Sequence, residues 1–117
     1  MSLILFHNPR CSKSRETLAL LEQRHIHPKI ELYLQNTYTP AELQHLADKL
    51  GISDVRQMMR TKDALYGELG LDNPSLSQEA LLQAISQHSS LLERPILING
   101  NKAKIGRPPE SVLAILD

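Results

Sequence analysis

The chain has 117 residues, which fits one domain with a substantial buried core. Thirteen basic and thirteen acidic residues cancel to a formal net charge of +0, which argues against a broad cationic surface for nucleic acid or anionic membrane. A single cysteine, Cys11, excludes both an intrachain disulfide framework and a zinc site built from several cysteines.

The N-terminal apolar run 3–6 predicts a buried strand, because it is short and stops at the turn residues His7-Asn8-Pro9. This run is too short for the core of a signal peptide. No apolar run in the chain approaches the roughly 18 residues of a membrane span. We therefore expect a protein of the cytoplasm with no membrane partner.

A helix is predicted from residue 12 to about residue 25, with Ser12 and Ser14 as candidate caps. A second strand is predicted over 30–34, because apolar residues alternate there with Glu31 and Tyr33. The apolar members of this strand are Ile30, Leu32 and Leu34. Strand, helix and strand together form a βαβ unit.

The middle of the chain, at about 39–90, is predicted to be helical. Thr39-Pro40-Ala41-Glu42 combines a cap, a proline at the first helical position and a capping-box glutamate, and Gly51 closes this helix. Further helical clusters are predicted over 54–66 and 77–88. The inward residues of the last are Leu81, Leu82 and Ile85.

The C-terminal part returns to strands. Asn99-Gly100-Asn101 lies between the apolar run 96–98 and the segment 102–105, which is typical of a β-hairpin. A final helix is predicted to open at Pro108-Pro109-Glu110. The element order therefore predicts an α/β protein with one sheet, helices on its faces and a helical insert.

Cys11 lies between an apolar strand and a helix start, where unpaired backbone N–H groups and the positive end of the helix dipole stabilise a thiolate. His7, Lys13 and Arg15 flank it and form an environment that lowers a thiol pKa. The same N–H groups form a cradle for anions. These features favour a reactive nucleophile over an inert buried cysteine.

Several other thiol and metal chemistries are disfavoured. His7 could tune Cys11 or simply satisfy its hydrogen bonds in the turn, and the five histidines lack a metal-ligand spacing, so we predict no metal site. Thr17 stands where a cysteine phosphatase would carry its arginine. Ser14 stands where a thioredoxin-type protein would carry its second cysteine, so an external thiol such as glutathione or a redoxin must resolve any adduct.

Three arginines, Arg60, Arg94 and Arg107, lie in separate segments, and their spacing alone is typical of solvated surface residues. Arg94 is more suggestive, because Pro95 follows it just before the predicted strand at 96–98. A proline in that position can be cis and hold the adjoining backbone near a site.

The segment His7-Asn8-Pro9-Arg10-Cys11-Ser12-Lys13-Ser14-Arg15 resembles the N-terminal hallmark of the glutaredoxin-dependent arsenate reductase family. The resemblance continues to the final helix through Leu32-Tyr33-Leu34, Met59-Arg60, Tyr66 with Leu69-Gly70-Leu71, Arg94-Pro95-Ile96 and Gly106-Arg107-Pro108. Ser12-Lys13-Ser14 replaces the Gly-Thr-Ser common in familiar arsenate reductases, which resembles a broader reductase-like subgroup.

This resemblance implies a single thioredoxin-like domain over 1–117, with β-α-β followed by β-β-α and a helical insertion at about 39–90. It implies that Cys11 attacks the arsenic of arsenate and that His7 helps to keep Cys11 ionised. The implied oxyanion-binding residues are Arg60, Arg94 and Arg107, and the implied supporting residues are Ser14, Arg15 and Pro95.

The resemblance also implies the partners of the reaction. Glutathione, as a co-substrate, would attack the arsenic adduct, and glutaredoxin would then remove the glutathione and release arsenite. No bound cofactor and no nucleic acid are expected.

Two other functions remain open from the residues. A related branch of the fold comprises redox-sensing regulators that bind RNA polymerase, although these typically use a Cys-x-x-Cys switch and Ser14 stands at its second position. A glutathione-linked reductase of another small oxyanion or mixed disulfide is the third reading.

Overall fold

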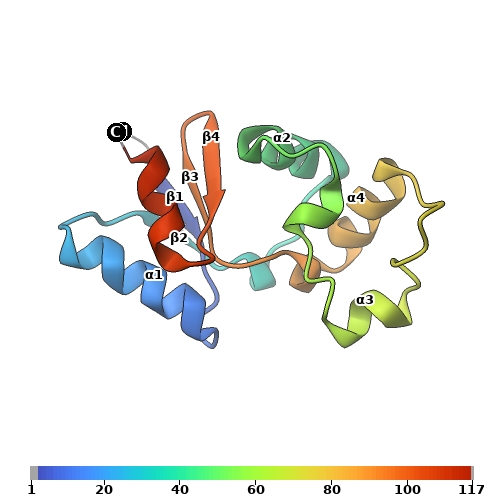
Figure 1. Ribbon diagram of the computed structural model, residues 1–117, viewed down its shortest axis with the longest axis horizontal. Helices are drawn as coiled ribbons and strands as arrows, with labels where there is room; N and C mark the ends of the chain where they lie inside the picture. The colour runs from blue at the N-terminus through green and yellow to red at the C-terminus, as the bar shows by residue number, and fades with distance from the viewer. Residues whose placement is uncertain (1–2, 117) are drawn as a thin grey trace.

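A computed structural model describes residues 3–116, so the predicted domain's residues 1, 2 and 117 lie outside the described part. A sheet with two helices stands at one end of the molecule, and a group of helices stands at the other (Figure 1). The sheet end is built from β1 Leu3–Phe6, α1 Ser12–Gln23, β2 Lys29–Glu31, β3 Ile96–Asn99, β4 Lys102–Ile105 and the 3-10 helix η4 Pro109–Ile115. No helix in residues 3–116 has the length and apolar character needed to cross a membrane.

The four strands form one mixed sheet in the order β2-β1-β3-β4. β1 pairs in parallel with β2 and antiparallel with β3, and β3 pairs antiparallel with β4. The hairpin predicted at Asn99-Gly100 is confirmed, and Gly100 takes the positive φ of 62° that its turn requires. This β-α-β and β-β-α arrangement confirms the thioredoxin-like fold.

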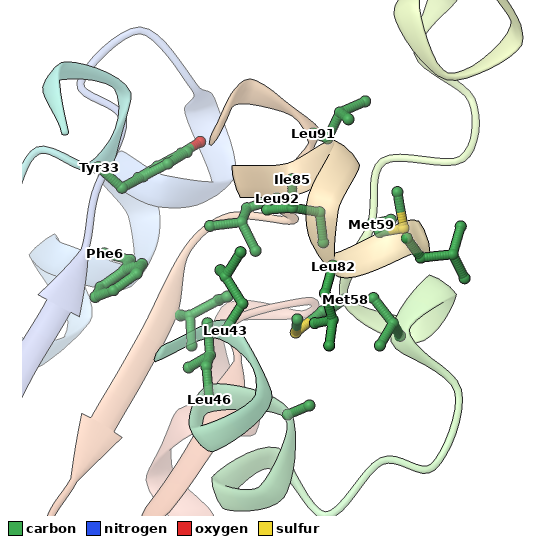
Figure 2. Packing of buried hydrophobic residues seen from close by; sticks show 14 of the residues in the cluster. Phe6, Tyr33, Leu43, Leu46, Met58, Met59, Leu82, Ile85, Leu91 and Leu92 are labelled. Carbon is green, nitrogen blue, oxygen red and sulfur yellow. The ribbon is translucent and has the colours of Figure 1, made fainter. Parts of the chain in front are cut away.

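Alternate residues of the central strands face two separate apolar clusters, as the period of a strand requires. The first cluster lies under α1 and η4 and contains Leu5, Leu21, Leu97, Val112 and Ile115. Phe6 and Ile96, their neighbours along β1 and β3, face the other way and join a larger cluster under the helical insert. Figure 2 shows Phe6 at the edge of this second cluster.

The insert contains α2 Pro40–Leu50, η2 Val55–Met58, α3 Ala64–Glu68, α4 Gln78–Gln87 and η3 Ser89–Leu91. The predicted capping box of α2 is confirmed, because Thr39 Oγ1 accepts from the Glu42 amide and the Glu42 carboxylate accepts from the Thr39 amide. Gly51 ends α2 in the left-handed conformation, at φ 71°. α4 begins after its Ser77 cap, and the predicted inward residues Leu81, Leu82 and Ile85 are all buried.

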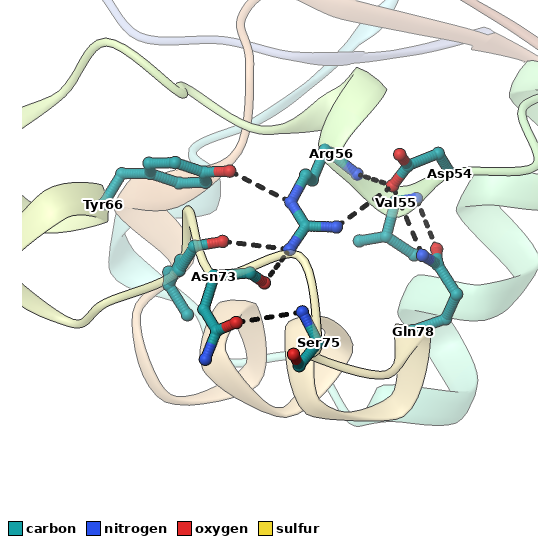
Figure 3. Close-up of polar contacts among 8 residues, drawn as sticks. Asp54, Val55, Arg56, Tyr66, Asn73, Ser75 and Gln78 are labelled. Carbon is teal, nitrogen blue, oxygen red and sulfur yellow. Dashed lines mark hydrogen bonds and ion pairs between the residues drawn. The ribbon is translucent and has the colours of Figure 1, made fainter.

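Arg56 ties the loops of the insert together (Figure 3). Its Nε donates to the Tyr66 hydroxyl at 3.1 Å, and its Nη2 donates to the carbonyls of Leu71 and Asn73 at 3.1 and 2.8 Å. Its Nη1 lies 3.9 Å from an Asp54 oxygen. A charged donor shared among these carbonyls holds α3 and the following loop against η2.

The second strand is shorter than predicted. β2 stops at Glu31, which pairs with Phe6 at the end of β1, so the ladder has no partner beyond it. The chain instead turns into the 3-10 helix η1 Tyr33–Gln35. Tyr33 is thereby buried and stacks on Phe6 with ring centroids 6.1 Å apart, while Leu34 is 46% exposed.

The single helical cluster predicted over 54–66 is wrong. Met59 is extended, at φ −112° and ψ 150°, and forms an antiparallel bridge with Leu92. Asp63 then starts a new helix by accepting a hydrogen bond from the Leu65 amide. A tertiary pairing and a second cap therefore divide the segment into η2 and α3.

Two local expectations also change. α1 is preceded by Cys11 as its N-cap residue rather than by Ser12 or Ser14. The predicted last helix is present as η4, a 3-10 helix, with Pro108 as its N-cap residue.

Candidate active site

The loop between β1 and α1 is organised by hydrogen bonds to Asn8. Its carbonyl accepts from the Cys11 amide and its side-chain oxygen accepts from the Arg10 amide, each at 3.0 Å. Asn8 in turn donates its own amide to Ser14 Oγ at 3.0 Å. The loop therefore delivers Cys11 directly to the N-terminus of α1, in an extended conformation at φ −95° and ψ 125°.

The environment of Cys11 lowers the pKa of its thiol below the usual value. Partial burial opposes ionisation, but the backbone N–H of Ser14 and the positive charge of Arg94 outweigh it, with a further contribution from the Lys13 N–H. These groups interact favourably with a thiolate and not with a thiol. The half-buried sulfur is therefore prepared as a nucleophile.

Ser14 is fully buried and bonds to His7 rather than acting as a surface cap. His7 Nδ1 lies 2.6 Å from Ser14 Oγ, which already accepts from the Asn8 amide. We assign the Ser14 hydroxyl as the donor to Nδ1, because no other acceptor lies within hydrogen-bond distance of it in residues 3–116. Burial, followed by the nearby Arg15 charge, lowers the pKa of His7, so the ring is neutral at pH 7.

His7 is predicted to help ionise Cys11, but within the described residues no direct contact joins the two side chains. The groups that lower the pKa of Cys11 are backbone amides and Arg94. His7 reaches the same loop through Ser14. Any effect of His7 on the thiolate passes through the position of the loop, not through a positive charge beside the sulfur.

Arg107 joins the cysteine to the opposite side of the site. Its Nη2 lies 3.7 Å from Cys11 Sγ, and its Nε donates to the Arg94 carbonyl at 2.9 Å. Glu93 Oε1 lies 3.1 Å from Arg94 Nη1 and 3.9 Å from Arg107 Nε. One carboxylate thus lies against both guanidinium groups.

Arg60 is brought to the same place by pairing between the insert and the segment before β3. Around the Met59–Leu92 bridge, the Arg60 amide donates to the Leu91 carbonyl, and the Glu93 amide donates to the Met58 carbonyl, each at 2.8 Å. A pocket of about 360 Å³ lies between these segments. It is lined by Arg60, Thr61, Lys62, Asp63, Glu93, Arg94 and Arg107.

Pro95 and Gly106 fix the backbone beneath the arginines. The Arg94–Pro95 and Arg107–Pro108 peptide bonds are both cis. The Gly106 amide donates to the Pro95 carbonyl at 2.9 Å. A side chain at Gly106 would lie only 2.7 Å from Thr17 Oγ1 and 2.8 Å from Pro95 Cγ, so this close approach requires glycine.

The remaining candidate, Arg15, contacts the β1–α1 loop and does not line this pocket. Its Nη1 donates to the Pro9 carbonyl at 2.9 Å, and its charge acts on His7. The structure therefore gathers Cys11, Arg94 and Arg107 into contact, with Arg60 across the pocket. Within residues 3–116, no three His, Cys, Asp or Glu side chains are grouped so as to hold a metal ion.

Two further residues belong to this site that the sequence interpretation did not assign to it. Burial raises the pKa of Tyr33, and the charges of Arg94, Arg60 and Cys11 also act on its hydroxyl, so this phenol lies among the site charges. Glu93 lies between two arginines in the pocket. The available signals were the position of Glu93 beside Arg94 and the place of Tyr33 in Leu32-Tyr33-Leu34, a segment that carries the family resemblance.

The fold and the site define a thioredoxin-like protein with one activated thiol beside an arginine-lined pocket. The chain belongs to the ArsC family, whose model matches residues 6–115. It is 70% identical over 116 residues to an arsenate reductase of Haemophilus influenzae, covering 99% of this chain and all of the relative. An arsenate reductase of Neisseria meningitidis is 53% identical, covering 96% of each chain.

A solved structure supports the same assignment. The structure described as an arsenate reductase from Vibrio cholerae superimposes with a TM-score of 0.96 at 50% identity, covering 99% of this chain and 98% of the other. Similarity at this level extends over the sheet, the insert and the site together. The family resemblance of the sequence is thereby confirmed.

Proposed function

We propose that this protein reduces arsenate to arsenite through an adduct between Cys11 and arsenic. The observation that carries the proposal is the position of Arg107, which contacts the Cys11 sulfur at 3.7 Å and also lines the pocket with Arg60 and Arg94. Arg107 thereby connects a pocket whose charges suit a tetrahedral oxyanion to the thiolate that would attack it. The names of the relatives from Haemophilus influenzae and Neisseria meningitidis support arsenate as this oxyanion.

The arginines have a clear physical task in this reaction. A thiolate and an oxyanion repel each other, so fixed cations and donors are needed to bring them together. Arg94 and Arg107 are held in place by Glu93 and by the Arg94 carbonyl, so little reorganisation is needed when the anion binds. In the first step the Cys11 sulfur bonds to arsenic, and one arsenate oxygen leaves as water after protonation.

The second thiol comes from outside the chain in this proposal. Ser14 occupies the position of a resolving cysteine. It is fully buried and forms hydrogen bonds with His7 and with the Asn8 amide. Glutathione therefore adds to the arsenic with loss of a second water. Glutaredoxin attacks the glutathione sulfur, the released electron pair reduces arsenic from +5 to +3, and hydrolysis frees arsenite and the Cys11 thiol. This cycle requires a reducing compartment, which supports a cytoplasmic location.

The test is arsenate reduction with glutathione and glutaredoxin, followed as NADPH oxidation by glutathione reductase, which reduces the oxidised glutathione that the cycle forms. Wild type is expected to turn over, Cys11→Ser to show no turnover, and the surface control Ser75→Ala to match wild type. Thermal unfolding of all three checks that the folds are equally stable. Reduction by Cys11→Ser would contradict the role of the thiol.

The same assay separates the other two functions. If wild type fails to reduce arsenate but still reduces a glutathione mixed disulfide through Cys11, the protein is a reductase of another substrate. If neither substrate is reduced and the protein binds RNA polymerase stoichiometrically, the regulator is the correct interpretation.

A further inference from the structure

Glu93 is a carboxylate inside a pocket whose other charges favour anions. It lines the pocket with Arg60, Arg94 and Arg107, and its Oε1 lies 3.1 Å from Arg94 Nη1. A carboxylate in such a place opposes the binding of any anion, because like charges repel. Attraction between Glu93 and the arginines does not by itself explain why a carboxylate lies in a pocket for anions.

Glu93 is held in a fixed place. Its backbone N–H donates to the Met58 carbonyl at 2.8 Å, next to the bridge between Met59 and Leu92. Its side chain is 25% exposed, and its ion pairs with Arg94 and Arg107 both use Oε1. In the described chain, no hydrogen bond or ion pair engages Oε2. Oε1 therefore pairs with the two arginines, and Oε2 remains available as a hydrogen-bond acceptor.

The charges of the pocket still suit an anion with Glu93 ionised. Four cationic side chains and two carboxylates line it, which leaves an excess of two positive charges. The cations are Arg60, Lys62, Arg94 and Arg107, and the carboxylates are Asp63 and Glu93. Asp63 is paired with Arg60 at 3.2 Å, so Glu93 is the carboxylate that lies between the two arginines nearer Cys11.

We infer that Glu93 makes this pocket selective for oxyanions that carry a hydroxyl group. Hydrogen arsenate and hydrogen phosphate can donate that hydroxyl to Oε2 while their other oxygens accept from the arginines. Sulfate is fully deprotonated near neutral pH and has only acceptors, so it faces the carboxylate with lone pairs on both sides. This inference rests on the proposed function only in taking the pocket as the oxyanion site.

The hydrogen bond sets the size of the effect. A hydrogen bond involving a charged group changes affinity by roughly 10- to 100-fold, and a site built to accept from a hydroxyl rejects an analogue that lacks it. Wild type is therefore expected to bind phosphate at least about tenfold more tightly than sulfate. If Glu93 only positioned Arg94 and Arg107, its removal would change the binding of both anions equally.

The experiment measures how inorganic phosphate and sulfate protect Cys11 from alkylation by iodoacetamide at pH 7. The apparent dissociation constant of each anion is obtained for wild type, for Glu93→Gln and for Glu68→Gln, an exposed control in α3 that removes the same charge. In Glu93→Gln the amide can donate to sulfate. We expect the preference for phosphate to fall to near unity in this variant, and Glu68→Gln to keep the wild-type preference.

The outcomes distinguish this inference from the proposed function. An unchanged phosphate-to-sulfate ratio in Glu93→Gln overturns the role of Glu93, even if wild type reduces arsenate. A ratio that depends on Glu93 supports it, even if wild type shows no arsenate reduction. Absence of protection by either anion in wild type also overturns it, because the pocket is then not an oxyanion site.

Discussion

The guanidinium of Arg107 lies 3.7 Å from the sulfur of Cys11, a residue 96 positions away in the sequence. Arg107 also donates to the Arg94 carbonyl and lies 3.9 Å from Glu93. The thiol and the pocket are therefore joined through one side chain. An anion bound to Arg107 in the pocket would therefore lie near the guanidinium that also contacts the thiol.

Replacement of Arg107 by alanine is expected to weaken anion binding much more than folding. The side chain is 32% exposed, so its loss leaves no large cavity, but it removes charge-assisted donors from the pocket. We expect the dissociation constant for phosphate to rise roughly 10- to 100-fold. Isothermal titration and thermal unfolding measure the two effects. Arg24→Ala, an exposed arginine after α1, is the charge-matched control, and equal phosphate affinity in Arg107→Ala and Arg24→Ala would contradict the role of Arg107.

Reactivity of Cys11 should extend to lower pH than that of an ordinary thiol. Although burial opposes ionisation, the Ser14 N–H and the Arg94 charge lower the pKa below its usual 9.0, so the thiolate fraction at neutral pH is raised. The midpoint of alkylation rate against pH is therefore expected below 9.0 in wild type. Arg94→Ala should move the midpoint upward. A midpoint unaffected by this substitution would show that Arg94 does not act on the sulfur.

Stability should fall in mild acid because of His7. Burial, with help from the Arg15 charge, lowers the pKa of His7 below 6.5, so the unfolded chain binds a proton more readily than the folded protein. The free energy of unfolding is therefore expected to decrease as pH falls below about 6.5, and His7 causes no such loss above it. Urea unfolding between about pH 7.5 and pH 5 measures this. Identical pH dependence in wild type and His7→Gln would refute the assignment.

Gly106→Ala should destabilise the protein, because the new methyl group meets Thr17 Oγ1 at 2.7 Å and Pro95 Cγ at 2.8 Å. Thr17 is fully buried and cannot move into solvent, so we expect a loss of roughly 1–3 kcal/mol. Gly67→Ala is the matched control, since nothing lies within 4 Å of that position in α3. Alanine there should gain about 0.5–1 kcal/mol. Chemical denaturation of both variants tests the contrast, which fails if the two respond alike.

The accuracy of the sequence interpretation depended on the range of the interactions. The α2 capping box at Thr39 and Glu42 and the hairpin turn at Gly100 were predicted correctly, because they involve residues within a few positions of one another. The strand over 30–34 was predicted too long, because β2 ends where its partner β1 ends. No local pattern carries that information.

The candidate site shows the same division. The position of Cys11 between a strand and a helix follows from neighbouring residues, and the structure has it at the start of α1. The local sequence predicts Ser14 as a cap at the position of a resolving cysteine, yet its burial against His7 depends on how the loop folds back on α1. Tyr33 lies at the site only because the chain turns into η1 after β2, where the Tyr33 ring stacks on Phe6.

The sequence by itself determined that the chain has a single cysteine and that this cysteine lies at a helix N-terminus, since both follow from residue identity and local backbone geometry. Only the tertiary structure decided which arginines meet that cysteine. The Met59–Leu92 bridge carries Arg60 to the pocket, and the pairing of Ile96 with Ile105 sets Arg94 beside Arg107. These pairings join distant segments through backbone hydrogen bonds, which depend on the packed fold and not on the spacing of residues along the chain.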